Sequence, residues 1–69
     1  MQRDLKGNPV VYAVYDRSKK RSGGIGWHRV ATFVQLENAE RFLKQEGNED
    51  YFISCNTATV QDIGLARDY

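Results

Sequence analysis

The sequence predicts a small α+β domain with two layers, in which a sheet is covered by one helix. Three observations support this prediction. Two segments in the first half of the chain carry the apolar and β-branched residues typical of strands. An amphipathic helical repeat follows directly, and a third short apolar segment follows the helix. The expected order is β-β-α-β with a last strand as an option, giving an antiparallel or mixed sheet of three or four strands.

Length and composition restrict the class of protein. A chain of 69 residues forms one domain, and a domain this small buries about 60% of its unfolded surface, so a partner or a homodimer would add stability. No apolar run is long enough for a membrane span, and the N-terminus has no signal-peptide pattern. The only cysteine, Cys55, cannot form an internal disulfide. We expect a cytoplasmic protein that does not associate with a membrane.

The N-terminal residues 1–9 are polar and end in Gly-Asn-Pro, which predicts a flexible arm before the first strand. Residues 10–15, VVYAVY, predict that strand. Its side chains alternate between two faces, and both faces are apolar, so we expect the strand to lie in the centre of the sheet.

Residues 16–26, DRSKKRSGGIG, predict a long basic loop that contains three glycines. The loop connects the first strand to a second strand at residues 27–34, which we expect to pair with the first as an antiparallel hairpin. Hairpin loops usually have two to five residues, and loops as long as this one are more often functional or disordered.

The helix is predicted from an apolar stripe that begins at Leu36 and includes Ala39, Phe42 and Leu43. Gly47 is a natural end, because glycine readily adopts the left-handed conformation that closes a helix. Gln35 stands at the N-cap position, where glutamine is not favoured. We therefore expect the helix to depend on tertiary packing.

Residues 51–55, YFISC, predict the third strand, and residues 58–60 either extend its pairing or form a short fourth strand. The single domain is expected to span residues 10–61. Residues 62–69 are expected to form a C-terminal tail or a short helical turn. Because one helix cannot cover both faces of a sheet, the second face should leave aromatic side chains exposed.

The charge of the chain is divided unevenly, although the net charge is only +1. Residues 1–29 contain seven basic and two acidic residues, a net charge of +5. Residues 30–69 contain three basic and seven acidic residues, a net charge of −4. This division indicates a polarised surface that can steer a charged partner.

The basic loop and the start of the second strand are the first candidate binding site. Lysine and arginine can neutralise phosphates, glycines permit close approach of the backbone, and aromatic rings can stack on bases. The alternatives are a solvated mobile loop, with the indole packing the end of the core, or contact with an acidic protein surface. The candidate nucleic-acid-binding residues are Arg17, Lys19, Lys20, Arg21, Trp27, His28 and Arg29.

The second candidate is a protein-interaction surface at an exposed sheet face or edge. It would suit an inhibitor or regulatory module of the kind that phages and mobile elements encode. The aromatic residues assigned to this surface are Tyr12, Tyr15, Tyr51 and Phe52.

No pattern in the sequence indicates catalysis. The glycine-rich sequence at residues 23–26 precedes a strand, whereas phosphate-binding glycine loops precede a helix. The spacing of His28 and Cys55 does not place them together as a nucleophile and its base. Histidine and cysteine do not cluster as metal ligands would, and the acidic residues lack the spacing of a calcium loop. We expect no enzymatic activity, catalytic residue, metal or cofactor.

Overall fold

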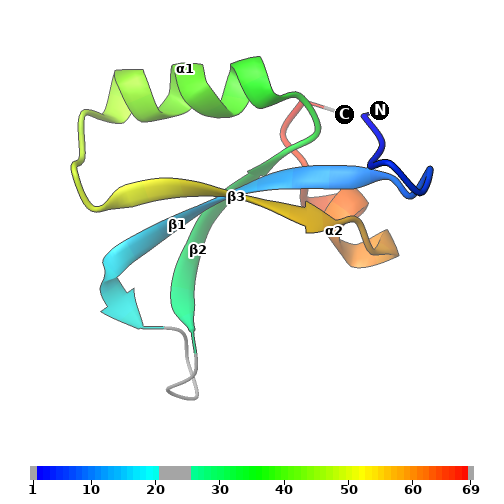
Figure 1. Cartoon of the computed structure of the whole chain (residues 1–69). Coiled ribbons are helices and arrows are strands. Elements are labelled where there is room, and N and C mark those ends of the chain that lie inside the picture. Colours follow the sequence, from blue (N-terminus) through cyan, green and yellow to red (C-terminus); the bar gives the residue numbers. More distant parts are fainter. Residues whose placement is uncertain (1, 21–25, 69) are drawn as a thin grey trace.

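A computed structural model describes residues 2–20 and 26–68, which form a three-stranded antiparallel sheet with two helices (Figure 1). The architecture is α+β, and the observed order is β-β-α-β-α. The elements are β1 (Val10–Lys20), β2 (Trp27–Phe33), α1 (Leu36–Glu46), β3 (Tyr51–Thr57) and α2 (Val60–Leu65).

The sheet has the order β2-β1-β3, so β1 lies in the centre as its two apolar faces predicted. Val14 lies opposite Ala31 of β2 and Ile53 of β3. The next residue, Tyr15, lies opposite Arg29 and Phe52. Because successive side chains point to opposite faces, this register places an apolar group on one face and an aromatic and charged group on the other.

The expectation of a loop over residues 16–26 is wrong for its first five residues, because β1 continues to Lys20. The Asp16 carboxylate accepts hydrogen bonds from the Ser18 amide at 2.8 Å and the Ser18 hydroxyl at 2.6 Å. The register with β2 shifts between Asp16 and Lys20, which indicates a bulge at this local turn. Arg17, Lys19 and Lys20 therefore lie on an irregular strand. The expected loop residues 21–25 lie outside the described part of the chain.

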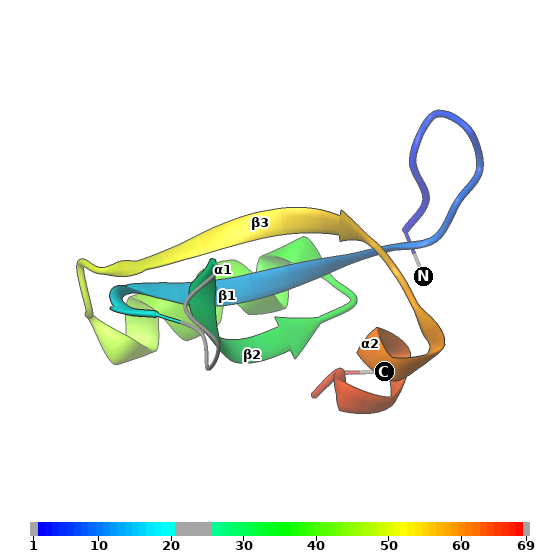
Figure 2. The ribbon, with the colours of Figure 1, turned by 90° about the horizontal axis from the view of Figure 1, so that it is seen from below.

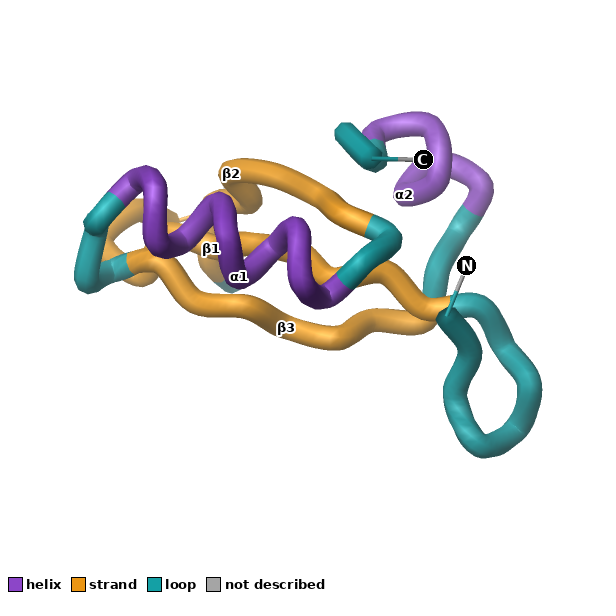
Figure 3. Tube along the Cα trace, turned by 90° about the horizontal axis from the view of Figure 1, so that it is seen from above, coloured by secondary structure: helices purple, strands orange, loops and turns teal. Residues whose placement is uncertain are grey.

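One face of the sheet is covered by α1, which lies along the strands (Figure 3). Ala39 of α1 is fully buried in a cluster with Val14 and Phe33. The Phe42 ring lies between Phe33, at 5.5 Å between ring centroids, and Tyr51, at 6.2 Å. The predicted apolar stripe thus forms the core, except that its first member, Leu36, is 37% exposed.

The two ends of α1 are closed in different ways. Gly47 adopts the predicted left-handed conformation, and its amide donates to the Leu43 carbonyl at 3.0 Å. Gln35 makes no side-chain cap, as expected from its residue type. The Asp68 carboxylate instead holds the residues just before the helix, because it accepts hydrogen bonds from the amides of Val34 at 2.6 Å and Gln35 at 3.0 Å.

The C-terminal segment that follows α2, residues 66–68, therefore packs against the rest of the domain. The Arg67 amide donates to the Thr32 carbonyl at 3.0 Å, and the Arg67 guanidinium lies 5.1 Å from the centroid of the Phe42 ring. These contacts bring the segment beside β2 and the start of α1.

The optional last strand at residues 58–60 is not formed, and α2 begins at Val60 instead. Thr59 and Asp62 form a capping box, in which each side chain accepts a hydrogen bond from the other residue's amide at 3.1 Å. The described residues thus form a second helix, where the expectation was one helix with a C-terminal tail or a short helical turn at residues 62–69. Figures 1 and 2 show α2 near one end of the sheet, on the side away from α1.

The described part of the N-terminal arm forms a turn. The Asp4 carboxylate accepts hydrogen bonds from the amides of Lys6 and Asn8, both at 2.9 Å, and Arg3 pairs with Pro9. Within residues 2–20 and 26–68, neither helix has the length and apolar character needed to cross a membrane.

Candidate binding surface on the open sheet face

Aromatic side chains from all three strands meet on the face of the sheet opposite α1. The rings of Tyr15 and Phe52 stack with their centroids 5.7 Å apart, because the two residues are direct partners in the β1–β3 register. Trp27 of β2 approaches Phe52 perpendicularly at 6.4 Å. The guanidinium carbon of Arg17 lies 4.9 Å from the centroid of the Phe52 ring. This group joins a cation to a flat aromatic surface.

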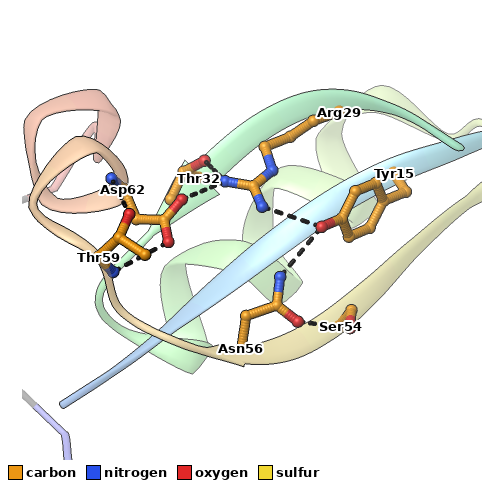
Figure 4. Close-up of polar contacts among 7 residues, drawn as sticks. All are labelled: Tyr15, Arg29, Thr32, Ser54, Asn56, Thr59 and Asp62. Atoms are coloured by element: carbon orange, nitrogen blue, oxygen red, sulfur yellow. Dashed lines mark hydrogen bonds and ion pairs between the residues drawn. The ribbon is translucent and has the colours of Figure 1, made fainter. Parts of the chain in front are cut away.

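A hydrogen-bond network continues this group toward α2 (Figure 4). Arg29 Nη1 lies 2.6 Å from Asp62 Oδ1, and Arg29 Nη2 donates to the Tyr15 hydroxyl at 3.0 Å. The Asn56 side-chain amide donates to the same hydroxyl at 3.0 Å. Ser54 in turn donates to Asn56 Oδ1 at 3.0 Å. The network connects the three strands to α2.

Both members of the ion pair are charged at neutral pH. Desolvation raises the pKa of Asp62, but hydrogen bonds from Arg29 and Thr59 outweigh it and hold the pKa below its ordinary value. Desolvation lowers the pKa of Arg29, and its hydrogen bonds to Asp62 and Tyr15 outweigh that effect and raise the pKa. Arg29, one of the predicted phosphate contacts, is therefore occupied in holding α2 on the sheet.

The remaining predicted nucleic-acid contacts gather on the projecting part of the β1–β2 hairpin. Lys20 is opposite Trp27, and His28 is opposite the buried Asp16. Arg21 lies outside the described residues. We call five of the exposed residues of this hairpin the basic arm: Arg17, Lys19, Lys20, Trp27 and His28.

The Asp16 carboxylate lies at the base of the basic arm. Hydrogen bonding from the Ser18 side chain lowers the pKa of Asp16, and this effect outweighs desolvation. The negative charge of Asp16 accepts the hydrogen bonds of the local turn at Ser18, which lies between Arg17 and Lys19. The amide of Arg17 donates to the Asp50 carbonyl at 2.9 Å, which connects the arm to the turn before β3.

An open hollow of about 410 Å³ lies between the basic arm and α2. One side is formed by strand residues and the other by residues of α2. Trp27 at the hollow is 44% exposed, and Leu65 is 57% exposed. The lining residues are Tyr15, Trp27, His28, Arg29, Gln61, Asp62 and Leu65.

The four aromatic residues assigned to a protein-interaction surface do not share one face. Tyr51 stacks on Phe42 of α1, and Tyr12 packs against the core on the same side. The Tyr12 hydroxyl also bonds to the Gln2 side chain. Tyr15 and Phe52 lie on the open face. The two pairs separate because their positions alternate along the strands.

Several residues of this surface were not singled out as site residues by the sequence. Asp62 could have been found from the pattern Thr59-x-x-Asp62, which resembles a capping box and marks the start of a helix. Asn56 and Gln61 have no comparable local signal. Their places depend on the register of β3 and on the direction in which α2 leaves it.

Metal ligands do not cluster within the described residues, where no group of three or more histidine, cysteine, aspartate or glutamate side chains could hold an ion. Cys55 is a free, exposed thiol on β3.

No known protein family, curated protein or solved structure shows a match to this chain.

Proposed function

We propose that this protein is a small, non-enzymatic nucleic-acid-binding module that acts in the cytoplasm through its basic arm. The observation that carries the proposal is the placement of exposed Arg17, Lys19 and Lys20 beside the exposed indole of Trp27. Lysine and arginine neutralise phosphates and release their counterions, and indole rings stack on bases.

The arrangement of Arg17 supports this role. Its guanidinium is positioned over the Phe52 ring, so less side-chain freedom is lost when it meets a phosphate. A guanidinium that stacks on a ring can still present its N–H groups to an anion at the edge of the stack. We therefore expect Arg17 to contribute more per residue than Lys19 or Lys20.

The small net charge does not oppose this proposal, because the charges are separated along the chain. The basic arm carries three permanent cations, and α1 carries Glu37, Glu40 and Glu46 on the other side of the sheet. For three phosphate contacts on a single strand, the logarithm of the association constant should fall with the logarithm of salt concentration with a slope of about −2.

The test is fluorescence anisotropy with labelled single-stranded and duplex oligonucleotides over a series of salt concentrations. The double variant Lys19→Ser/Lys20→Ser should weaken binding at least tenfold and make the salt dependence shallower. The matched control is Lys6→Ser/Lys44→Ser, which removes the same charge from the N-terminal turn and from α1. Absence of binding at low salt, or equal losses in both double variants, would contradict the proposal.

A second candidate function, protein interaction by strand pairing, is favoured by the outer edge of β3. Among the described residues, β3 pairs only with β1, whereas the outer edge of β2 receives the Arg67 amide. The β3 sequence, YFISCNT, contains neither a charged residue nor a proline. Exposed edge strands usually carry such residues to prevent pairing with other chains, so β3 is suited to pair with a partner strand or a second copy.

This second candidate predicts a complex that persists at high salt, because strand pairing depends on backbone hydrogen bonds. Light scattering should detect a homodimer at high protein concentration, and Cys55→Lys should dissociate it by placing a charge at the edge. Cys55→Ser is the matched control that leaves the edge uncharged. A protein that is monomeric at every concentration would contradict the homodimer.

A further inference from the structure

We propose that the hollow between the basic arm and α2 holds one unpaired base of a single-stranded nucleic acid. This inference rests on the proposed nucleic-acid binding and deepens it, because it names the form of the ligand and a subsite for it. The strand would cross the open face of the sheet, with its phosphates at the basic arm and one base turned into the hollow.

The aromatic side of the hollow suits the face of a base. Trp27 is 44% exposed, and its plane is at 89° to the Phe52 ring. A perpendicular contact of this kind leaves at least one face of the indole uncovered by Phe52. A base that stacks on an aromatic side chain contributes roughly ten- to hundredfold to affinity, whatever its identity.

The opposite side of the hollow suits the polar edge of a base. Gln61 is exposed on α2 and lines the hollow from this side, and exposed His28 lines it from the strand side. A carboxamide has both a donor and an acceptor, and glutamine uses the two together to bind adenine in nucleic-acid complexes. Leu65 supplies an apolar rim. A nucleobase has the same combination of apolar faces and a polar edge.

The size and walls of the hollow restrict what it can accept. Its volume of about 410 Å³ is in the range of small-molecule sites and is sufficient for a base with its sugar. The faces of bases in a duplex are covered by their neighbours in the stack, so a stacking wall can be used only by an unpaired or extruded base. These features favour a single strand over a duplex.

The hollow is also fixed in place beside the phosphate contacts. The Arg29–Asp62 pair at 2.6 Å and the capping box of Asp62 hold α2 against the sheet. Tyr15 lines the hollow, and Arg17 lies two residues further along β1 on the same face. A strand whose phosphate contacts Arg17 is therefore close enough to place an adjoining base against Trp27.

The test uses the fluorescence of Trp27, which is the only tryptophan in the chain. The intact protein is titrated with a mixed-sequence single-stranded 12-mer and with the duplex of the same sequence. We expect the single strand to quench Trp27 and to bind at least tenfold more tightly than the duplex. Trp27→Ala should lose about tenfold or more in single-strand affinity, measured by anisotropy, and Trp27→Phe should restore part of it.

Gln61→Ala should weaken single-strand binding two- to fivefold, and Gln45→Ala, on the exposed surface of α1, is its matched control. Circular dichroism melting confirms that each variant is folded. Equal binding of single strand and duplex with no response from Trp27, while Lys19→Ser/Lys20→Ser still abolishes binding, would overturn the base subsite and leave the proposed function standing. Failure of both nucleic acids to bind at low salt would overturn both.

Discussion

The two faces of the sheet are constructed from different interactions. The face under α1 is apolar, with Val14 and Ala39 fully buried and Phe33 only 7% exposed. The opposite face also buries Val11 and Ala13, but it adds an ion pair, hydrogen bonds between side chains, and an indole that is 44% exposed. Apolar burial stabilises a fold without requiring specific directions, whereas directional bonds can hold groups that remain accessible. The comparison assigns most of the stability to the covered face and the proposed recognition to the open face.

The largest expected effect comes from an aromatic ring on the covered face. Phe42→Ala removes the ring that packs between Phe33 and Tyr51, and we expect the free energy of unfolding to fall by about 3 kcal/mol. Phe52→Ala is the matched change on the open face, and we expect it to cost about 1 kcal/mol because Phe52 does not pack against the buried core cluster, whereas Phe42 does. Urea unfolding followed by circular dichroism measures both. Equal losses would show that the two faces do not divide stability and recognition.

The ion pair on the open face should have the next largest effect. Asp62→Asn leaves the Arg29 guanidinium without its charged partner and weakens the capping box, so we expect a loss of about 1–2 kcal/mol in the free energy of unfolding. A double-mutant cycle with Arg29→Gln measures the coupling between the two side chains. A coupling near zero would mean that the pair does not hold α2 on the sheet.

The Asp68 carboxylate lies at the edge of the covered face, and its contribution to stability depends on pH. Desolvation raises the pKa of Asp68, but hydrogen bonds from Asn38 and from the amides of Val34 and Gln35 outweigh it and lower the pKa below 3.8. The contribution of Asp68 to stability is therefore complete above the ordinary pKa and is lost as the pH falls through the lowered value.

We expect Asp68→Ala to reduce the free energy of unfolding by about 1 kcal/mol at pH 7, because the amides of Val34 and Gln35 lose their hydrogen-bond acceptor. The difference from the native chain should begin to shrink near the ordinary aspartate pKa of about 3.9, where the unfolded carboxylate becomes protonated, and it should be lost as the pH falls through the lowered pKa of the native carboxylate. Urea midpoints from pH 2.5 to pH 7 measure this difference. Glu49→Ala, in the exposed turn before β3, is the control, and an Asp68→Ala loss that stays constant with pH would contradict this contribution of the Asp68 carboxylate.

The covered face was the more predictable of the two, because its signals are local. The stripe of Ala39, Phe42 and Leu43 and the glycine at position 47 define α1 from the sequence, and the apolar residues of β1 place that strand in the centre. The absence of a side-chain cap at Gln35 was also predictable. The hydrogen bond from the Gln35 amide to Asp68, which is 33 residues away, depends on the path of the whole chain.

The open face depends on contacts between distant residues, which a local pattern does not reveal. Arg29 was assigned to phosphate because the sequence places it beside other basic residues, but the fold places it beside Asp62. Arg17 was expected in a loop because residues 16–26 are basic and contain three glycines. A hydrogen bond between Asp16 and Ser18 instead accompanies a bulge within β1, and β3 supplies the Phe52 ring on which the Arg17 guanidinium lies.

The smallest expected effect on stability is that of the Tyr15 hydroxyl, and it separates the two roles of the open face most clearly. Tyr15→Phe keeps the ring that stacks on Phe52 but removes the oxygen that accepts hydrogen bonds from Arg29 and Asn56. Because Arg29 retains Asp62, we expect a loss of only about 0.5–1 kcal/mol in the free energy of unfolding. If the network fixes the wall of the hollow, single-strand affinity should nevertheless fall severalfold, as measured by anisotropy at constant salt. Unchanged affinity would mean that the stacked rings alone position the ligand, and that the network serves only to attach α2.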